Sequence, residues 1–172
     1  IYYDFKDSVR NIAIIDGTLT NFASMYYLDT VNPITQLKNN WDKHPQGVSC
    51  MTNLATVYDW YKNTLNFKSI DGKGQVLYCF IEAERISEDV KDNAAYVGGD
   101  VQVFFCGSAD TYFKYAPFAQ LDVTAHEYTH GVFQHVADRS FNGGGVMLES
   151  INEGYADIFG CLIEGNWMMA ED

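Results

Sequence analysis

The chain has 172 residues, of which 47% are hydrophobic and 15% aromatic, which is enough for a packed core in one domain or two small lobes. Its net charge of −12 argues against nucleic acid or an anionic membrane surface as the main partner. No apolar run approaches the roughly 18 residues of a membrane span. The acidic excess has two interpretations, solubility or, where carboxylates converge, a cation such as Ca²⁺.

Both ends of the chain look processed. The first residues contain neither an initiator Met nor the pattern of a signal peptide. We therefore expect that a leader and propeptide have been removed, as from a zymogen, or that the chain was cut there. The C-terminus follows Trp167 without a turn signal and is interpreted in the same way.

The first seventy residues are predicted to be irregular and β-rich. Residues 9–15 and 18–22 form an expected hairpin around Asp16-Gly17, a dipeptide that suits a tight turn. Residues 44–47 are expected to be loop, because they carry Pro45 and Gly47.

An amphipathic helix is predicted next. Thr52 is a suitable cap for its start and Asn66 for its end. Its apolar residues recur near a 3.6-residue period, and they are Met51, Leu54, Ala55, Tyr58, Tyr61 and Leu65.

The second half of the chain alternates strands and helices. In chain order we predict a turn at 71–74, strands at 75–83, 93–96 and 101–105, a helix at 120–136, a loop at 139–145 and a helix at 150–163. In the last helix, Ser150 and Glu153 have the spacing of a capping box.

The four cysteines have no zinc-knuckle or redox-motif spacing. They are Cys50, Cys79, Cys106 and Cys161, and no two are separated by only two residues. An even number permits two disulfides in three connectivities, and Cys79 and Cys106 both end strand-like runs that could face each other across a sheet. Four buried free thiols are equally compatible with this composition.

The central motif is His126-Glu127-Tyr128-Thr129-His130, an H-E-x-x-H sequence within the predicted helix 120–136. Residues at i and i+4 share one helix face, so both imidazoles can reach one zinc ion. Glu127 lies one residue round the helix, where a carboxylate can act as general base on water beside the metal. The alternative is a helix that carries two surface histidines by chance.

The helix at 150–163 can complete the site. A catalytic zinc takes three protein ligands, and Glu153 on a second helix is a natural third one. Asp157 lies four residues later on the same face, where it can accept the spare N–H of a ligand histidine and orient its ring. An ordinary acidic helix face is the alternative interpretation.

These two segments together, residues 122–132 and 151–160, resemble the thermolysin-like family of neutral zinc metalloproteases, within the gluzincin class. A weaker resemblance covers residues 54–63 and 93–96. The resemblance implies an α+β fold, in which a twisted, mainly antiparallel sheet is followed by the H-E-x-x-H helix and a packed third-ligand helix.

The resemblance also implies residue roles. His126, His130 and Glu153 would hold zinc, Glu127 would activate water and Asp157 would orient His126. The substrate peptide would pair with Asn93 and the backbone of Ala94 along an edge strand, and Tyr96 would border the cleft.

Calcium is a further implication of the resemblance, because the family holds Ca²⁺ with clustered acids beside these helices. The matching residues are Asp122, Glu164 and Glu171. Asn166 stands where an Asp is usual, so one calcium site is expected rather than two.

We therefore interpret residues 1–172 as the N-terminal, zinc-binding domain of a secreted endopeptidase. The resemblance implies that a C-terminal helical domain, absent from this chain, supplies further groups that stabilise the transition state. Two alternatives stay open: a non-catalytic fragment or degenerate relative that binds zinc or calcium without turnover, and an interaction domain without metal.

Overall fold

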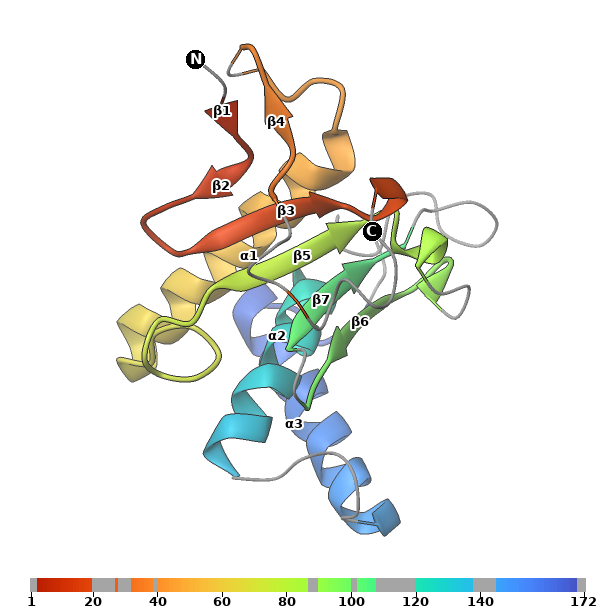
Figure 1. Ribbon diagram of the computed structural model, residues 1–172. Helices are drawn as coiled ribbons and strands as arrows, with labels where there is room; N and C mark the ends of the chain where they lie inside the picture. The colour runs from red at the N-terminus through yellow and green to blue at the C-terminus, as the bar shows by residue number, and fades with distance from the viewer. Residues whose placement is uncertain are drawn as a thin grey trace.

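The computed structural model of the chain describes residues 3–19, 27, 32–38, 40–86, 90–99, 102–107, 120–137 and 145–169. Figure 1 shows its elements, which in chain order are β1 (Tyr3–Asp4), β2 (Lys6–Asp7), β3 (Ile12–Asp16), η1 (Gly17–Leu19), β4 (Thr35–Gln36), α1 (Pro45–Leu65), β5 (Leu77–Ile81), η3 (Ala83–Arg85), β6 (Ala94–Val97), β7 (Val103–Cys106), α2 (Leu121–Val136) and α3 (Gly145–Glu164). None of the helices in these ranges is long and apolar enough to cross a membrane.

The main sheet has five strands in the order β2-β3-β5-β7-β6, and β1 pairs separately with β4. The predicted α+β class is confirmed, but the sheet is mixed rather than mainly antiparallel. β3 pairs with β5, and β5 with β7, in parallel, whereas the outer pairs β2–β3 and β6–β7 are antiparallel. The helix α1 makes the crossover from β3 to β5, a connection that parallel neighbours require.

The predicted hairpin around Asp16-Gly17 is wrong. β3 ends at Asp16 and continues into the short helix η1, and its hairpin partner is the preceding strand β2. Gly17 is needed for another reason: a Cβ atom there would lie 2.7 Å from the Ile81 carbonyl oxygen. The glycine therefore permits close passage of two chain segments, and residues 20–22 of the predicted hairpin lie outside the described residues.

The helix α1 begins at Pro45, earlier than predicted, so the expected loop at 44–47 and the Thr52 cap are wrong. Proline is favoured in the first helical turn, where its missing N–H costs no hydrogen bond. Thr52 lies inside the helix and donates its hydroxyl to the Val48 carbonyl oxygen at 2.8 Å. The predicted end is confirmed, because Asn66 adopts the left-handed conformation with φ of 54°.

The last two helices were predicted at nearly the right positions. The predicted helix 120–136 is confirmed as α2, whereas α3 begins at Gly145, before the expected start. The capping box is consequently wrong: Ser150 lies inside α3 and donates its hydroxyl to the Val146 carbonyl oxygen at 2.9 Å. Of the predicted loop 139–145, residues 139–144 lie outside the described residues.

The core has two layers, one on each face of the sheet. The larger cluster lies between the sheet and the helices α1 and α2, and the smaller one lies on the opposite face near η3. β7 is buried along its whole length, and β3 along all but its last residue. Strands that are buried on both faces are typical of parallel pairing, and β3 and β7 are the two strands that pair in parallel with β5.

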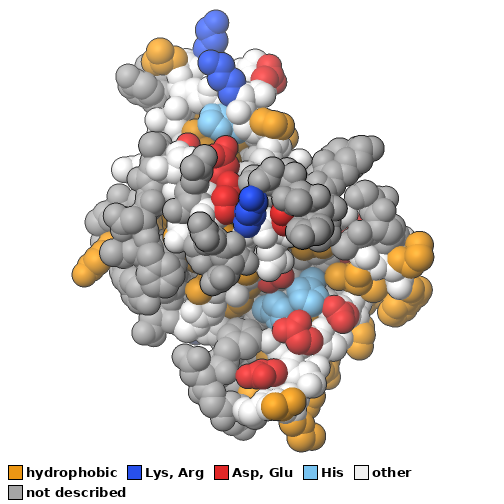
Figure 2. Space-filling view, turned by 90° about the vertical axis from the view of Figure 1, so that its right-hand side faces the viewer, with side chains coloured by type: hydrophobic (Ala, Val, Ile, Leu, Met, Phe, Trp, Pro, Cys, Tyr) orange, Lys and Arg blue, Asp and Glu red, His pale blue; other side chains and the backbone are white. Residues whose placement is uncertain are grey.

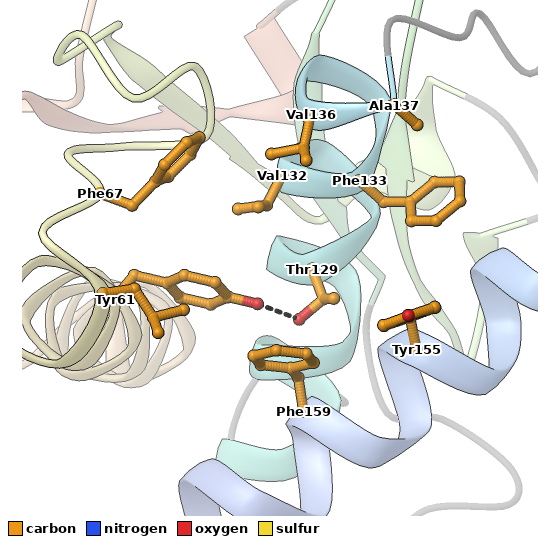
Figure 3. A pocket seen from close by; sticks show the side chains of 10 residues that line it. Tyr61, Phe67, Thr129, Val132, Phe133, Val136, Ala137, Tyr155 and Phe159 are labelled. Carbon is orange, nitrogen blue, oxygen red and sulfur yellow. Dashed lines mark hydrogen bonds between the residues drawn. The ribbon is translucent and has the colours of Figure 1, made fainter.

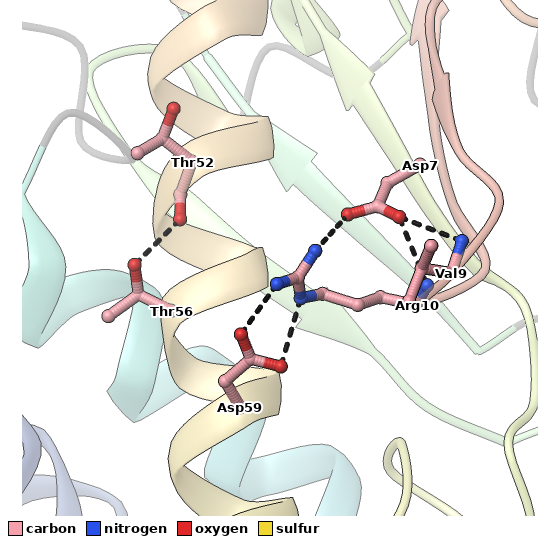
Figure 4. Close-up of polar contacts among 6 residues, drawn as sticks. All are labelled: Asp7, Val9, Arg10, Thr52, Thr56 and Asp59. Carbon is pink, nitrogen blue, oxygen red and sulfur yellow. Dashed lines mark hydrogen bonds and ion pairs between the residues drawn. The ribbon is translucent and has the colours of Figure 1, made fainter.

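An arginine ties the β2–β3 turn to α1, as Figure 4 shows. The Arg10 side chain donates to Asp59 on α1 at 2.6 and 3.0 Å and to Asp7 at 2.6 Å. The Arg10 hydrogen bond lowers the pKa of Asp59. Partial burial opposes the charge of Asp7, but hydrogen bonds from Arg10 and from backbone N–H groups outweigh it and lower its pKa.

We expect Arg10→Met to lower the free energy of unfolding at pH 7 by about 1 kcal/mol, because the pairs are partly exposed and screened. The pKa values of Asp7 and Asp59 are lower in the folded chain than in the unfolded chain, where they are about 4. The ion pairs therefore stabilise the fold above about pH 4, and this stability is lost as the pH falls through the folded-state pKa values. The difference from the wild type should therefore shrink as the pH falls through the range in which Asp7 and Asp59 become protonated.

Urea unfolding across that pH range measures the effect. Lys43→Met, at an exposed lysine, makes the same change in net charge and is the control. A stability difference for Arg10→Met that persists at the lowest pH would mean that side-chain packing, rather than the ion pairs, is responsible.

Candidate metal centre

The helix α2 is held between α1, the sheet and α3. Tyr128 and Ala125 are completely buried, and the Tyr128 ring stacks on Tyr61 of α1 at a centroid distance of 5.2 Å. A Cβ atom at Gly131 would lie 2.9 Å from the Ile70 side chain, so glycine lets the helix approach closely. With these faces buried, the remaining face of α2 presents its histidines to α3.

The predicted zinc ligands converge. The Nε2 atoms of His126 and His130 lie 2.9 Å apart, and Glu153 Oε2 lies 3.4 Å from the first and 3.6 Å from the second. Figure 2 shows histidine side chains beside carboxylates on this face. Ligands about 2.0–2.1 Å from a tetrahedral zinc lie about 3.3 Å from one another, so this triangle of two nitrogens and one oxygen fits that ion.

The other ring nitrogens face polar groups of α3. His126 Nδ1 lies 2.9 Å from Asp157 Oδ1, within ion-pair distance, although the direction of the ring N–H does not meet hydrogen-bond geometry. On the second histidine, the side chain of Asn152 lies close enough to the ring of His130 to raise its pKa, although Asn152 Oδ1 does not meet hydrogen-bond geometry.

Asn152 is the site residue that the sequence analysis missed. Asn152 is on α3 and is 2% exposed where α3 packs against α2. A signal was present, because Asn152 directly precedes Glu153 and therefore lies beside the ligand on the helix. Burial lowers the pKa of His130 and outweighs the opposite effect of the Asn152 side chain, which favours the neutral imidazole that metals bind.

Glu127 lies beside the ligand atoms, and atoms of His126, Glu127 and His130 that can bind metal all lie within 4.8 Å of one another. Burial raises the pKa of Glu127 to about 8, with a contribution from the negative charge of Glu153. The backbone N–H of Tyr96 donates to Glu127 Oε2 at 2.6 Å and acts in the opposite direction. That bond fixes the carboxylate against β6.

The three predicted substrate residues occupy β6 and the position before it. The strand β6 is one edge of the five-stranded sheet. Asn93 is exposed, and its side-chain oxygen accepts the N–H of Ala94 at 2.9 Å. The Tyr96 ring packs in the core against Phe104, and its backbone N–H reaches Glu127; its place at the border of a substrate cleft stays a prediction.

The predicted calcium residues are less closely gathered. Asp122, in the first turn of α2, is buried with 1% exposure, and its backbone oxygen lies beside Gly160 of α3. Glu164 ends α3, and Glu171 lies outside the described residues. Within the described ranges, His126, Glu127 and His130 form the one set of three His, Cys, Asp or Glu residues whose ligand atoms lie within 4.8 Å of one another. The calcium residues form no such set there, so the calcium site stays a prediction.

A cavity of about 340 Å³ lies beside the metal-ligand face, between the ends of α1 and α2 and the middle of α3. Figure 3 shows Val132, Val136 and Phe133 of α2 facing Tyr155 and Phe159 of α3 across it. Its lining is mostly apolar, which distinguishes it from the polar centre formed by the histidines.

One hydrogen bond at this cavity joins α1 to the zinc-motif helix. The Thr129 hydroxyl donates to the Ala125 carbonyl oxygen at 2.7 Å and lies 2.8 Å from the Tyr61 hydroxyl. Because a hydroxyl group has a single hydrogen, Tyr61 must be the donor to Thr129 (Figure 3).

This arrangement predicts unequal effects for two conservative substitutions. Tyr61→Phe removes the donor but leaves Thr129 bonded to Ala125, so we expect a loss of about 1 kcal/mol. Thr129→Val instead leaves a buried tyrosine hydroxyl without its acceptor, which should cost about 1–3 kcal/mol. Urea unfolding of both variants measures the order, and a larger loss for Tyr61→Phe would contradict the assigned direction of the bond.

Comparison with known proteins agrees with this geometry. Residues 2–134 match the family model described as the thermolysin metallopeptidase catalytic domain. The chain therefore belongs to the thermolysin family of metallopeptidases.

Individual relatives are bacterial proteins. The chain is 33% identical over 174 residues to a bacillolysin of Bacillus amyloliquefaciens, covering 100% of this chain and 28% of that protein. It is 32% identical over 133 residues to an extracellular elastase of Staphylococcus epidermidis, covering 76% of this chain and 25% of that protein. It thus spans less than a third of the length of either relative.

A solved structure has the same fold. The precursor of protealysin, a metalloproteinase from Serratia proteamaculans, superimposes with a TM-score of 0.65 at 19% identity, covering 89% of this chain and 42% of that one. The family match ends at residue 134, before α3. The prediction that Glu153 is the third zinc ligand is therefore supported by its distances to the two histidines and by the bacillolysin similarity, which extends along the whole chain.

Proposed function

We propose that this chain is the zinc-binding domain, residues 1–172, of a secreted endopeptidase, in which His126, His130 and Glu153 hold the ion. The observation that carries the proposal is the triangle of two Nε2 atoms and one carboxylate oxygen, with sides of 2.9, 3.4 and 3.6 Å. The name of the extracellular elastase supports secretion.

Peptide hydrolysis follows from the groups around that triangle. Zinc, when bound, supplies a Lewis acid that polarises the scissile carbonyl and makes water more acidic. Glu127 accepts a proton from the attacking water and later donates it to the leaving amine. Its pKa of about 8 without metal is near neutrality, which suits a group that both accepts and donates. Tyr96 holds the carboxylate in place through its backbone N–H.

The edge strand β6 supplies the surface for the substrate. In an antiparallel pair, the backbone N–H and C=O groups of alternate residues point toward the partner strand and away from it. Tyr96 directs its N–H to Glu127, so its backbone groups point away from β7. Ala94 lies two residues earlier and presents its carbonyl oxygen on the same edge. An extended peptide that pairs there as an added strand lies next to Glu127 and the ligand triangle.

A C-terminal helical domain of the same protein is the proposed partner. The side chains of Glu153 and Asp157 are 59% and 60% exposed, so this side of the centre is uncovered. The outer face of α3 carries an apolar stripe of residues three or four apart, made of Met147, Ile151, Tyr155, Ile158 and Leu162. Together with the cavity of Figure 3, this stripe forms an apolar surface for the polypeptide that the longer relatives contain.

Calcium is proposed where the start of α2 meets the end of α3. Burial raises the pKa of Cys161, and the negative charges of Asp122, Asp157 and Glu164 add to the shift. A cation with oxygen ligands at this junction would offset the negative charges of these carboxylates.

The alternative function is metal binding without turnover. It applies where no other part of the protein supplies groups that stabilise the transition state. Activity of the whole protein separates the two functions, whereas zinc binding by the chain is expected for both.

We expect Glu153→Ala to weaken zinc binding by at least about 100-fold, more than the 10–100-fold typical of residues that only orient a ligand. Competition with a chromophoric chelator measures the affinity. Glu149→Gln, an exposed glutamate one turn earlier on α3, is the control and should bind zinc normally. Unchanged affinity in Glu153→Ala would remove Glu153 from the ligand set.

We expect Glu127→Gln to retain one zinc per chain but to lower peptidase kcat of the whole protein by at least about 100-fold, the scale of general acid–base catalysis. The amide keeps the shape of the side chain but cannot accept the proton. Hydrolysis of an internally quenched peptide measures the rate, and elemental analysis measures zinc. Retained turnover would show that another group is the base.

A further inference from the structure

Residues on both sides of the β6–β7 connection are bonded to the last turn of α2. Gln134 Oε1 accepts the backbone N–H of Gly99, which follows β6, at 3.3 Å. The next residue of the helix, His135, places its Nε2 atom 3.2 Å from Oε1 of Gln102, which precedes β7. The end of α2 therefore holds this edge hairpin of the sheet at two points.

Gln134 also holds the side chain of an edge-strand residue. Its Oε1 atom lies 3.3 Å from the Tyr96 hydroxyl. A backbone N–H can only donate, so the Gln134 atom that meets Gly99 is the carbonyl oxygen of the amide, and the Tyr96 hydroxyl must donate to that same oxygen. One acceptor thus serves two donors, one within β6 and one just beyond its end.

The second contact of Tyr96 with α2 is made by its backbone. Glu127 and Gln134 are seven residues apart, so they share one face of the helix and lie about 10 Å apart along its axis. Tyr96 reaches both, because its backbone N–H donates to Glu127 Oε2 at 2.6 Å and its hydroxyl donates to Gln134. Tyr96 is only 9% exposed, and its ring packs against Phe104. A single residue of the edge strand is therefore fixed at two levels of the zinc-motif helix.

The bond to Glu127 depends on how the strand is held. Its donor is a backbone group, so the N–H cannot reach the carboxylate by a change of rotamer and keeps its place only while β6 keeps its position. On the side of Tyr96 that leads to the β6–β7 connection, that position is fixed by the two bonds to Gln134. Loosening this end of β6 would move the N–H away from Glu127.

We propose that Gln134 is a positioning residue, which holds the Tyr96 hydroxyl and the Gly99 N–H and thereby keeps the Tyr96 N–H on Glu127. Its consequence for catalysis rests on the proposed function of Glu127 as the base, whereas its effect on the Tyr96 N–H does not. The two parts are therefore tested by separate measurements on the whole protein.

Hydrogen exchange followed by mass spectrometry tests the effect on the strand. Gln134→Leu removes the acceptor, and we expect the amides of residues 96–99 to exchange about 10-fold faster, because local opening becomes easier. Amides of α1 and β5 should exchange as in the wild type. Gln134→Glu keeps an acceptor oxygen and should protect residues 96–99 as the wild type does. Both variants retain the bond of His135 to Gln102, so the hairpin should stay folded.

Peptidase kinetics test the consequence for the site. We expect Gln134→Leu to lower kcat by about 10-fold, since displacement of a catalytic group by about 1 Å can cost about 100-fold. Zinc content should stay at one per chain, and KM should change by less than about threefold, because Ala94 lies at the far end of β6 from Gln134. Gln134→Glu should restore most of the rate. Arg10→Met, with a similar expected loss of stability away from the centre, is the control and should keep the wild-type kcat.

Three results would overturn the proposal: unchanged exchange of residues 96–99 in Gln134→Leu, unchanged kcat despite faster exchange, or an equal loss of kcat in Gln134→Glu. If Gln134→Leu does not fold, Tyr96→Phe replaces it, because it removes one of the two donors and should raise exchange by a smaller factor. A wild-type protein without peptidase activity would contradict the proposed function instead, and exchange alone would then decide whether Gln134 holds the Tyr96 N–H.

Discussion

The embedding of α2 between α1, the sheet and α3 is the constraint on which the candidate centre depends. A helix with two histidines one turn apart always has both on one face, but that face becomes a site only when it meets a third ligand. Stacking of Tyr128 on Tyr61, together with the close approach at Gly131, fixes the rotation of α2 about its axis. The two imidazoles then point at Glu153 rather than at solvent.

Electrostatics agree with this geometry. Burial favours the neutral form of His130, the form of imidazole that binds metals, and Asp157 lies 2.9 Å from His126 Nδ1, the ring nitrogen that does not belong to the triangle. Burial also favours a protonated Glu127 in the absence of a cation. A divalent ion would reverse that preference, because positive charge stabilises the carboxylate. A cation bound beside Glu127 and Glu153 would therefore lower the free-energy cost of holding both carboxylates ionised.

The surface of α3 divides into two functional faces. One face carries Glu153 and Asp157 toward the zinc-motif helix, and the other carries an exposed apolar stripe that continues into the cavity beside Phe159. A single helix thus joins the candidate metal centre to an exposed apolar surface.

Local pattern explains which predictions succeeded. The helix α2 and the end of α1 at Asn66 were predicted correctly, because a 3.6-residue period and a left-handed cap are properties of short segments. The expected hairpin at Asp16-Gly17 failed because Gly17 is required by the approach of Ile81, a contact that sequence spacing does not reveal. The parallel pairing of β3 with β5 is likewise non-local, since it depends on the α1 crossover.

The sequence by itself determined which side chains share a helix face: His126 with His130 on one helix, and Glu153 with Asp157 on the next. Only the tertiary structure decided how these parts meet. It brought Glu153 to within 3.6 Å of the Nε2 atoms of His126 and His130, placed Asn152 beside His130, and turned the backbone N–H of Tyr96 toward Glu127. The physical reason is that periodicity specifies the face on which a side chain lies, whereas packing of distant segments specifies what that face contacts.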